Sequence, residues 1–112
     1  MSSVRELICV PSAIPAAERQ GHFALAQELL HERAKERRDL ADGYAIRFGC
    51  DDFEAVARFV LNERRCCPFM RFELRVEPES GPLWLRMTGP EGTHGVLQAE
   101  LSLTGSCGCA QP

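Results

Sequence analysis

Apolar residues recur along this chain with two different periods, and these predict its helices and strands. A period of three to four residues over about residues 16–37 predicts a helix, with an apolar stripe at Phe23, Ala26, Leu29, Leu30 and Ala34. A second helix is predicted from about residue 51, and its buried face consists of Phe53, Val56, Ala57 and Val60. This helix must end before Pro68, which also disfavours helical geometry at Cys67.

Strict alternation predicts strands elsewhere in the chain. It is clearest over residues 71–77 and 83–88, and the proline- and glycine-containing turn between them predicts a hairpin. Residues 5–10 and 44–48 are predicted to form two further strands, and a short last helix is expected from about residue 90 or 93 to 103. The predicted order is β-α-β-α-β-β-α. It indicates an α+β fold with a mainly antiparallel sheet and helices on one face.

Length, composition and charge narrow the classes of protein. The 112 residues, of which 45% are hydrophobic, predict one globular domain over residues 1–104 and a flexible tail over residues 105–112. The sequence begins without a signal-peptide pattern and has no apolar run near the roughly 20 residues of a membrane span, so a cytoplasmic location and no membrane partner are expected. A net charge of −3 argues against a nucleic-acid partner. The basic cluster over residues 33–38 is interleaved with acids and is interpreted as a solvated helix face.

The candidate chemistry lies in the adjacent pair Cys66 and Cys67, between the second helix and the hairpin. A cytosolic protein keeps its cysteines reduced, and two neighbouring thiolates can bind one soft ion or react with one oxidant. The preceding Arg64 and Arg65 would lower the thiol pKa if they folded over the pair, and Glu63 could orient one of them. The helix C-terminus acts in the opposite direction, because its partial negative charge disfavours a thiolate.

The other four cysteines differ in their surroundings. Cys9 lies in an apolar run and is interpreted as a small core residue, whereas Cys50 is either a packing residue or a third thiol. Cys107 and Cys109 lie in the glycine-containing tail and are predicted to form a mobile dithiol arm that completes a metal site. The predicted metal ligands are therefore Cys66, Cys67, Cys107 and Cys109. The ligand type favours a soft ion such as Hg(II) or Cu(I), with Cd(II) and As(III) as further options, and excludes a classical zinc finger.

The three histidines add little to this site. His22 and His31 are nine residues apart, so they lie on opposite faces of the first helix and cannot hold one ion together. Glu18 and His22 are one helical turn apart, which favours a surface hydrogen bond. His94, at the start of the last helix, is a speculative extra ligand.

A resemblance to known proteins rests on the motif Glu63-Arg64-Arg65-Cys66-Cys67-Pro68-Phe69 and on the later turn Thr88-Gly89-Pro90-Glu91-Gly92. The chain resembles a group of small bacterial proteins with a Glu-Arg-x-Cys-Cys-Pro-Phe core, which are similar to accessory proteins of heavy-metal resistance. The resemblance covers most of residues 5–103 and implies a ligand role for Cys66 and Cys67 only. Met87 stands where these proteins have leucine, and the tail cysteines lie outside the matched region.

Three hypotheses follow from the sequence, which favours a binding protein over an enzyme. The first is a scavenger, chaperone or detoxification accessory protein that binds a soft metal or metalloid through Cys66 and Cys67. The second is a thiol oxidoreductase or thiol transferase, in which one cysteine of the pair is the nucleophile and the other, Cys50 or a tail cysteine resolves it. A disulfide between adjacent residues closes a strained ring, so pairing with a distant cysteine such as Cys50 or a tail cysteine is favoured. The third is a structural or interaction domain, with a homodimer formed through the Trp84 face or a sheet edge as one option.

Overall fold

The computed structural model describes residues 7–102 of the chain. Its elements are α1 (Ala16–Glu28), β1 (Glu36–Leu40), β2 (Gly43–Phe48), α2 (Phe53–Cys66), β3 (Arg71–Val76), β4 (Leu83–Thr88) and α3 (Thr93–Ser102). A π-helical turn at Leu29–Arg33 extends α1, and short 3-10 turns form at Pro11–Ala13 and Cys50–Asp52. Within this described range no helix is long and apolar enough to cross a membrane.

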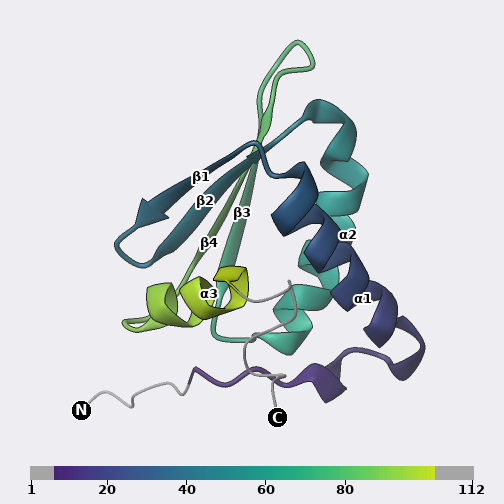
Figure 1. The fold of residues 1–112 in the computed structure, drawn as a ribbon, viewed down its shortest axis with the longest axis vertical. Helices are drawn as coiled ribbons and strands as arrows, with labels where there is room; N and C mark the ends of the chain where they lie inside the picture. Colours follow the sequence, from purple (N-terminus) through teal and green to yellow (C-terminus); the bar gives the residue numbers. More distant parts are fainter. Residues whose placement is uncertain (1–6, 103–112) are drawn as a thin grey trace.

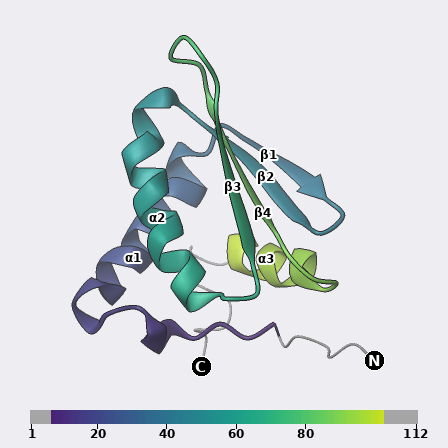
Figure 2. The ribbon, with the colours of Figure 1, turned by 180° about the vertical axis from the view of Figure 1, so that it is seen from behind.

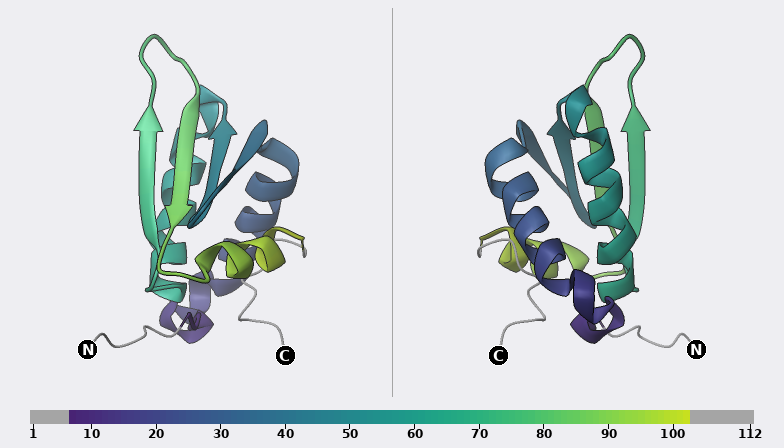
Figure 3. Two further views of the ribbon diagram at one scale, coloured as in Figure 1. Left: turned by 90° about the vertical axis from the view of Figure 1, so that its left-hand side faces the viewer. Right: turned by 90° about the vertical axis from the view of Figure 1, so that its right-hand side faces the viewer.

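The four strands form one antiparallel sheet in the order β1-β2-β4-β3 (Figure 1). The central strands β2 and β4 pair directly, with Ile46 opposite Leu85, and the predicted hairpin of β3 and β4 is present. The helices α1 and α2 lie together on one side of the sheet, as the two views of Figure 3 show. The predicted α+β class, with its antiparallel sheet, is therefore confirmed.

The hydrophobic core lies between the sheet and these helices. Alternate residues of β2 and β4 point into it, and helices contribute residues at three- and four-residue spacing. Its fully buried members include Ile46, Phe48, Leu85, Val56 and Leu29. A smaller apolar cluster lies at the C-terminal end of α2 and contains Cys9, Ile14, Cys66, Cys67 and Phe69.

The first strand of the sheet follows α1 instead of preceding it, so the predicted order agrees only roughly with the observed one. The described part of the predicted first strand, residues 7–10, has no regular secondary structure. The predicted first helix ends early, because Ala34 adopts an extended conformation with φ −62° and ψ 127°. Residues 36–40 then form β1 rather than a solvated helix face. Backbone pairing of β1 with β2 outweighs the helical pattern of its charges.

The buried face of α2 is also rotated from the predicted one. Val56 is fully buried as expected, but Phe53 is 48% exposed and Ala57 is exposed. The buried residues of this helix are Val56, Phe59, Asn62, Glu63 and Cys66. Glu63 and Cys66 thus lie on the same face as the core residue Phe59.

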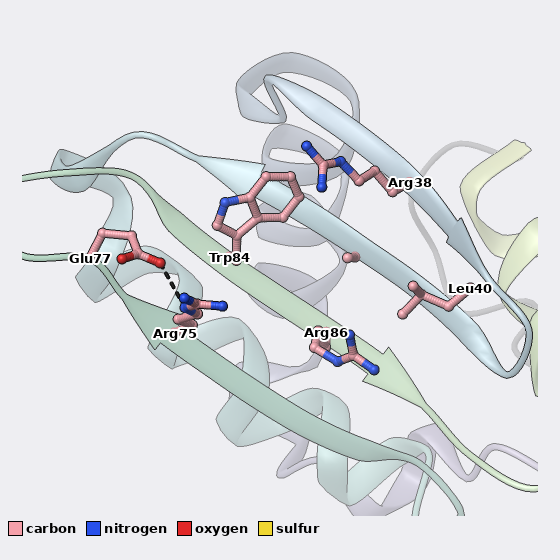
Figure 4. Close-up of a pocket in the computed structure, with 7 residues that line it drawn as sticks. Arg38, Leu40, Arg75, Glu77, Trp84 and Arg86 are labelled. Carbon is pink, nitrogen blue, oxygen red and sulfur yellow. Dashed lines mark ion pairs between the residues drawn. The ribbon is translucent and has the colours of Figure 1, made fainter.

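The opposite face of the sheet is not covered by α1 or α2 (Figure 3). It carries Trp84 and the ion pairs of Arg47 with Glu36 and of Arg86 with Glu73. The guanidinium of Arg38 stacks over the indole of Trp84 at 4.6 Å, and Figure 4 shows the two side chains next to each other. Both line a hollow of about 360 Å³. Hydrogen bonds from Arg38 and Arg47 lower the pKa of the Glu36 carboxyl. Ion pairs between residues on neighbouring strands and between residues close in sequence therefore explain why charged side chains gather on this face of the sheet.

Gly43 provides a test of the packing between the central strands. A Cβ atom at this position would overlap the backbone carbonyl of Met87. We expect Gly43→Ala to lower the free energy of unfolding by about 3 kcal/mol, because overpacking next to a fixed backbone cannot relax easily. Gly21→Ala is the matched control, since a Cβ there meets nothing within 4 Å and should stabilise α1 by about 0.5–1 kcal/mol. Urea denaturation measures both, and equal effects would contradict the prediction.

Candidate metal centre

Three cysteines form a compact buried cluster at the C-terminal end of α2. The Sγ atoms of Cys9, Cys66 and Cys67 all lie within 4.8 Å of one another. Their exposed fractions are 5%, 0% and 1%, so the cluster is shielded from solvent. Three sulfur atoms at this spacing can coordinate one metal ion.

The end of α2 determines the positions of Cys66 and Cys67. Cys66 is the last helical residue, and the Cys67 amide still donates to the Glu63 carbonyl at 2.8 Å. Cys67 itself has φ −120° and ψ 77°, which confirms that the residue before Pro68 leaves helical geometry. The helix end therefore turns both side chains into the small apolar cluster.

Cys9 is supplied by the N-terminal segment, residues 7–14, which passes close to the end of α2 (Figure 2). The amide of Val10 donates a hydrogen bond to the Cys66 carbonyl at 2.5 Å. Ile14 is fully buried, and Arg19 donates two hydrogen bonds to its carbonyl oxygen. These contacts fix the segment next to the cysteine pair and close the cluster from solvent.

Within the cluster, the Sγ atoms of Cys9 and Cys67 are in direct contact at 2.8 Å. The sequence predicted that a distant cysteine is a better oxidation partner than the adjacent one, and named Cys50 or a tail cysteine. Among the described residues, the distant cysteine that the fold brings to Cys67 is Cys9, 58 residues away. Cys9 is a buried residue, as predicted, but it is also part of the site.

A buried carboxylate and imidazole adjoin the cysteines. Glu63 Oε1 and His22 Nε2 are 2.8 Å apart, and both side chains are 1% exposed. The thiol of Cys67 donates to the other carboxylate oxygen, Glu63 Oε2, at 3.6 Å. The imidazole of His22 stacks on Phe59 with a centroid distance of 5.6 Å. A continuous polar chain therefore runs from Cys67 through Glu63 to His22 inside an apolar environment.

The remaining predicted residues lie elsewhere or outside the described range. Cys50 is exposed and donates to Asp51 at 3.7 Å, so it is not part of the cluster. Cys107 and Cys109 fall outside residues 7–102, as does the tail to which they belong. The structure thus brings together Cys66 and Cys67 of the predicted ligands and adds Cys9.

The neighbours of the predicted site also differ from expectation. Arg64 and Arg65 are exposed, and Arg65 donates to Asn62 rather than folding over the thiols. Glu18 accepts from Asn62, so the predicted surface pair of Glu18 with His22 is replaced by the buried pair of His22 with Glu63.

His94, the speculative extra ligand, stacks on Tyr44 and lies 3.4 Å from an Asp39 carboxylate oxygen. These contacts are with the sheet, and they give no support to a ligand role for His94.

The fold and the cluster define an α+β protein with a buried three-cysteine centre. Comparisons with protein-family models, with curated proteins and with solved structures find no match to this chain. The function is therefore inferred from the residues of the site.

Proposed function

We propose that this protein binds a soft metal or metalloid ion through Cys9, Cys66 and Cys67, as a scavenger, chaperone or detoxification accessory protein. The observation that carries the proposal is the placement of three Sγ atoms within 4.8 Å of one another. Thiolates are the protein ligands that soft ions prefer. The resemblance of the 63–69 motif to accessory proteins of heavy-metal resistance points to the same class of ligand.

The spacing of the sulfur atoms suits a low coordination number. An ion about 2.3 Å from each of three coplanar sulfur ligands holds these roughly 4 Å apart. The Cys9 and Cys67 sulfur atoms, now 2.8 Å apart, would have to separate by about 1 Å, which a change of side-chain torsion can supply. The N-terminal segment must move to admit the ion, because the cluster is buried.

A reducing compartment such as the cytoplasm fits this function, because only reduced cysteines can bind the ion. Binding of the ion by these three cysteines requires neither the open face of the sheet nor a second copy of the chain. The tail cysteines Cys107 and Cys109 remain candidates for delivering the ion to the buried cluster.

Native mass spectrometry of the reduced protein tests the proposal. We expect uptake of one equivalent of a soft ion from a panel of Hg(II), Cu(I), As(III) and Zn(II). Uptake should be lost in the Cys66→Ser/Cys67→Ser variant, because one thiolate cannot hold the ion in competition with solution thiols. Circular dichroism of that variant shows whether the fold is retained.

Cys50→Ser is the matched control, since this cysteine is exposed and outside the cluster. It should take up the ion like the wild type. Truncation after Thr104 tests the tail, and reduced uptake there would assign it a role in binding or delivery. Unchanged uptake by a folded Cys66→Ser/Cys67→Ser variant would contradict the proposal.

A second candidate function, thiol redox chemistry, is favoured by the contact between Cys9 and Cys67. In this function the Cys9 and Cys67 thiols of the fully reduced protein would lose two hydrogen atoms to an added oxidant and form a disulfide. Peptide mapping after mild oxidation would find the Cys9 peptide linked to the Cys67 peptide. Turnover with a disulfide substrate, without uptake of any ion, would favour this function over metal binding.

A further inference from the structure

Helices α1 and α2 lie side by side (Figure 1), and a hollow of about 290 Å³ opens between them. This volume is near the lower end of the range for sites that bind small molecules. The described residues that line the hollow come from one face of each helix: Glu18, Gly21, His22 and Leu25 from α1, and Arg58 and Asn62 from α2. The hollow therefore has both charged and apolar walls.

A buried nitrogen atom at the floor of this hollow has no partner. His22 Nε2 is 2.8 Å from Glu63 Oε1, and the His22 side chain is 1% exposed. The other ring nitrogen, Nδ1, is buried without a hydrogen-bond partner among residues 7–102. The two nitrogens of an imidazole point in nearly opposite directions, and Glu63 is not part of the lining, so Nδ1 points towards the hollow. A buried polar atom without a partner is costly, and a ligand that supplies the partner removes this cost.

Two hydrogen-bond donors face the hollow at the level of His22. A proton on each ring nitrogen lets His22 form a neutral pair with the buried Glu63 carboxylate, and buried charges are nearly always paired. Nδ1 then carries a hydrogen. The helices run antiparallel, since Glu18 meets Asn62 and His22 stacks on Phe59. Arg58 therefore lies near His22, and its exposed guanidinium has no ion pair within the described range. Two such donors favour a carboxylate ligand.

Glu18 gives the hollow a negative end. It lies one helical turn before His22, so the two side chains are neighbours on α1. Its Oε1 atom accepts a hydrogen bond from Asn62 at 3.2 Å, and a carboxylate can accept further hydrogen bonds. The Asn62 amide also accepts from Arg65 at 2.8 Å. A ligand that complements both ends carries an ammonium group close to a carboxylate, as an α-amino acid does.

Gly21 leaves space for the rest of such a ligand. It lies inside α1, where glycine is less favourable to the helix than alanine. A Cβ atom at this position would meet nothing within 4 Å, and the φ of Gly21 is not positive. Neither packing nor backbone geometry therefore requires glycine here. A side chain at this position would instead occupy the hollow, whose apolar wall is the half-buried Leu25.

We propose that this hollow binds an α-amino acid with an apolar side chain. The ligand carboxylate accepts hydrogen bonds from His22 Nδ1 and Arg58, and its ammonium group donates to Glu18. The apolar side chain lies over Gly21 and against Leu25. A rotamer change of a lining side chain exposes Nδ1, which is itself covered. This inference goes beyond the proposed metal-binding function and uses none of the cysteines.

Three ligands that share one carbon skeleton test the inference: leucine, isocaproate, which lacks the ammonium group, and isoamylamine, which lacks the carboxylate. Each is titrated into the reduced, isotope-labelled full chain and followed by NMR of the backbone amides. We expect a Kd of about 1 mM or less for leucine, with the largest shifts at Gly21 and His22. Each analogue should bind at least about tenfold more weakly, because each loses a charge-assisted hydrogen bond.

Three variants place the ligand in the hollow. Gly21→Leu should abolish leucine binding without unfolding the protein, because its side chain fills the hollow from a position where Cβ meets no atom within 4 Å. Arg58→Gln should weaken leucine binding at least about tenfold but leave isoamylamine unaffected. Arg64→Gln is the matched control, since Arg64 is exposed on the same helix and outside the lining.

Three results would overturn the inference. The first is isocaproate or isoamylamine binding as tightly as leucine, and the second is unchanged leucine binding by a folded Gly21→Leu variant. The third is the absence of leucine-dependent shifts at about 10 mM, well above the expected Kd. None of these results depends on whether the cysteine cluster binds an ion.

Discussion

Cys9→Ser should weaken binding of arsenite to the reduced protein by more than about 100-fold. Loss of a residue that only hydrogen-bonds to a metal ligand already lowers affinity roughly 10–100-fold, and Cys9 is itself a proposed ligand. Cys9 supplies one of the three clustered sulfur atoms and comes from a segment far away in sequence. With serine there, arsenic forms at most two bonds to the sulfur atoms of this cluster and keeps one hydroxyl group. Titration under anaerobic conditions, followed by native mass spectrometry, measures the affinity and the number of hydrogens lost.

Two comparisons make this prediction specific. Hg(II), which is satisfied by two thiolates, should lose much less affinity than arsenite in the same variant. Cys50→Ser should leave both affinities unchanged, because Cys50 is exposed and bonds to Asp51. If Cys9→Ser retained arsenite as well as the wild type, Cys9 would be a packing residue, as its apolar neighbours alone suggested.

The sequence predicted two of the three cysteines of the cluster and missed the third for a physical reason. Cys66 and Cys67 are adjacent and lie between a clear helix and a clear strand, so their placement follows from local pattern. Cys9 joins them only because the N-terminal segment turns through residues 11–13 and passes close to the end of α2. Such a contact depends on tertiary packing, and the spacing of the cysteines does not encode it.

The sequence did contain a signal for Glu63. The residues Val56, Phe59, Glu63 and Cys66 follow one another at three- and four-residue steps, so they share a helix face. The predicted stripe of Phe53, Val56, Ala57 and Val60 centred the buried face about one position away, so the burial of Glu63 was not predicted. Glu63 lies on the helix face of Val56 and Phe59, and His22 lies on the face of Ala26 and Leu29. Two such polar residues on apolar helix faces indicate a buried pair, because a buried charged residue is nearly always paired.

The sheet shows the same contrast between local and tertiary control. β3 and β4 alternate cleanly, and the structure confirms their hairpin. β1 has mainly charged residues and little strand propensity, so its pattern predicts a helix, yet its backbone pairs with β2 along five residue pairs. An edge strand of this kind is defined by its partner, and propensity alone does not identify it.

Removal of one partner of the buried His22 and Glu63 pair should be the most destabilising change in α1 or α2. We expect Glu63→Leu or His22→Leu to lower the free energy of unfolding by about 3–5 kcal/mol, as for other buried pairs that lose one member. Both side chains are 1% exposed in the native protein, so the group that remains after either substitution is buried without its partner. Urea denaturation of the reduced protein gives the values, and His31→Leu, at an exposed position, is the control with an effect of about 0.5 kcal/mol or less.

The double variant His22→Leu/Glu63→Leu decides whether the pair stabilises the fold or only avoids a penalty. Because the pair is packed against Phe59 and Phe23, two apolar side chains can fill the same space, and we expect the double variant to be at least about 2 kcal/mol more stable than either single one. Additive losses in the double variant would contradict this coupling. Glu63→Gln should cost about 1–2 kcal/mol, since its amide keeps a hydrogen bond to His22 but replaces one of the two carboxyl oxygens with an NH₂ group. A stable double variant with lowered arsenite affinity would then show that the chain from Cys67 to His22 is retained for the metal centre and not for folding.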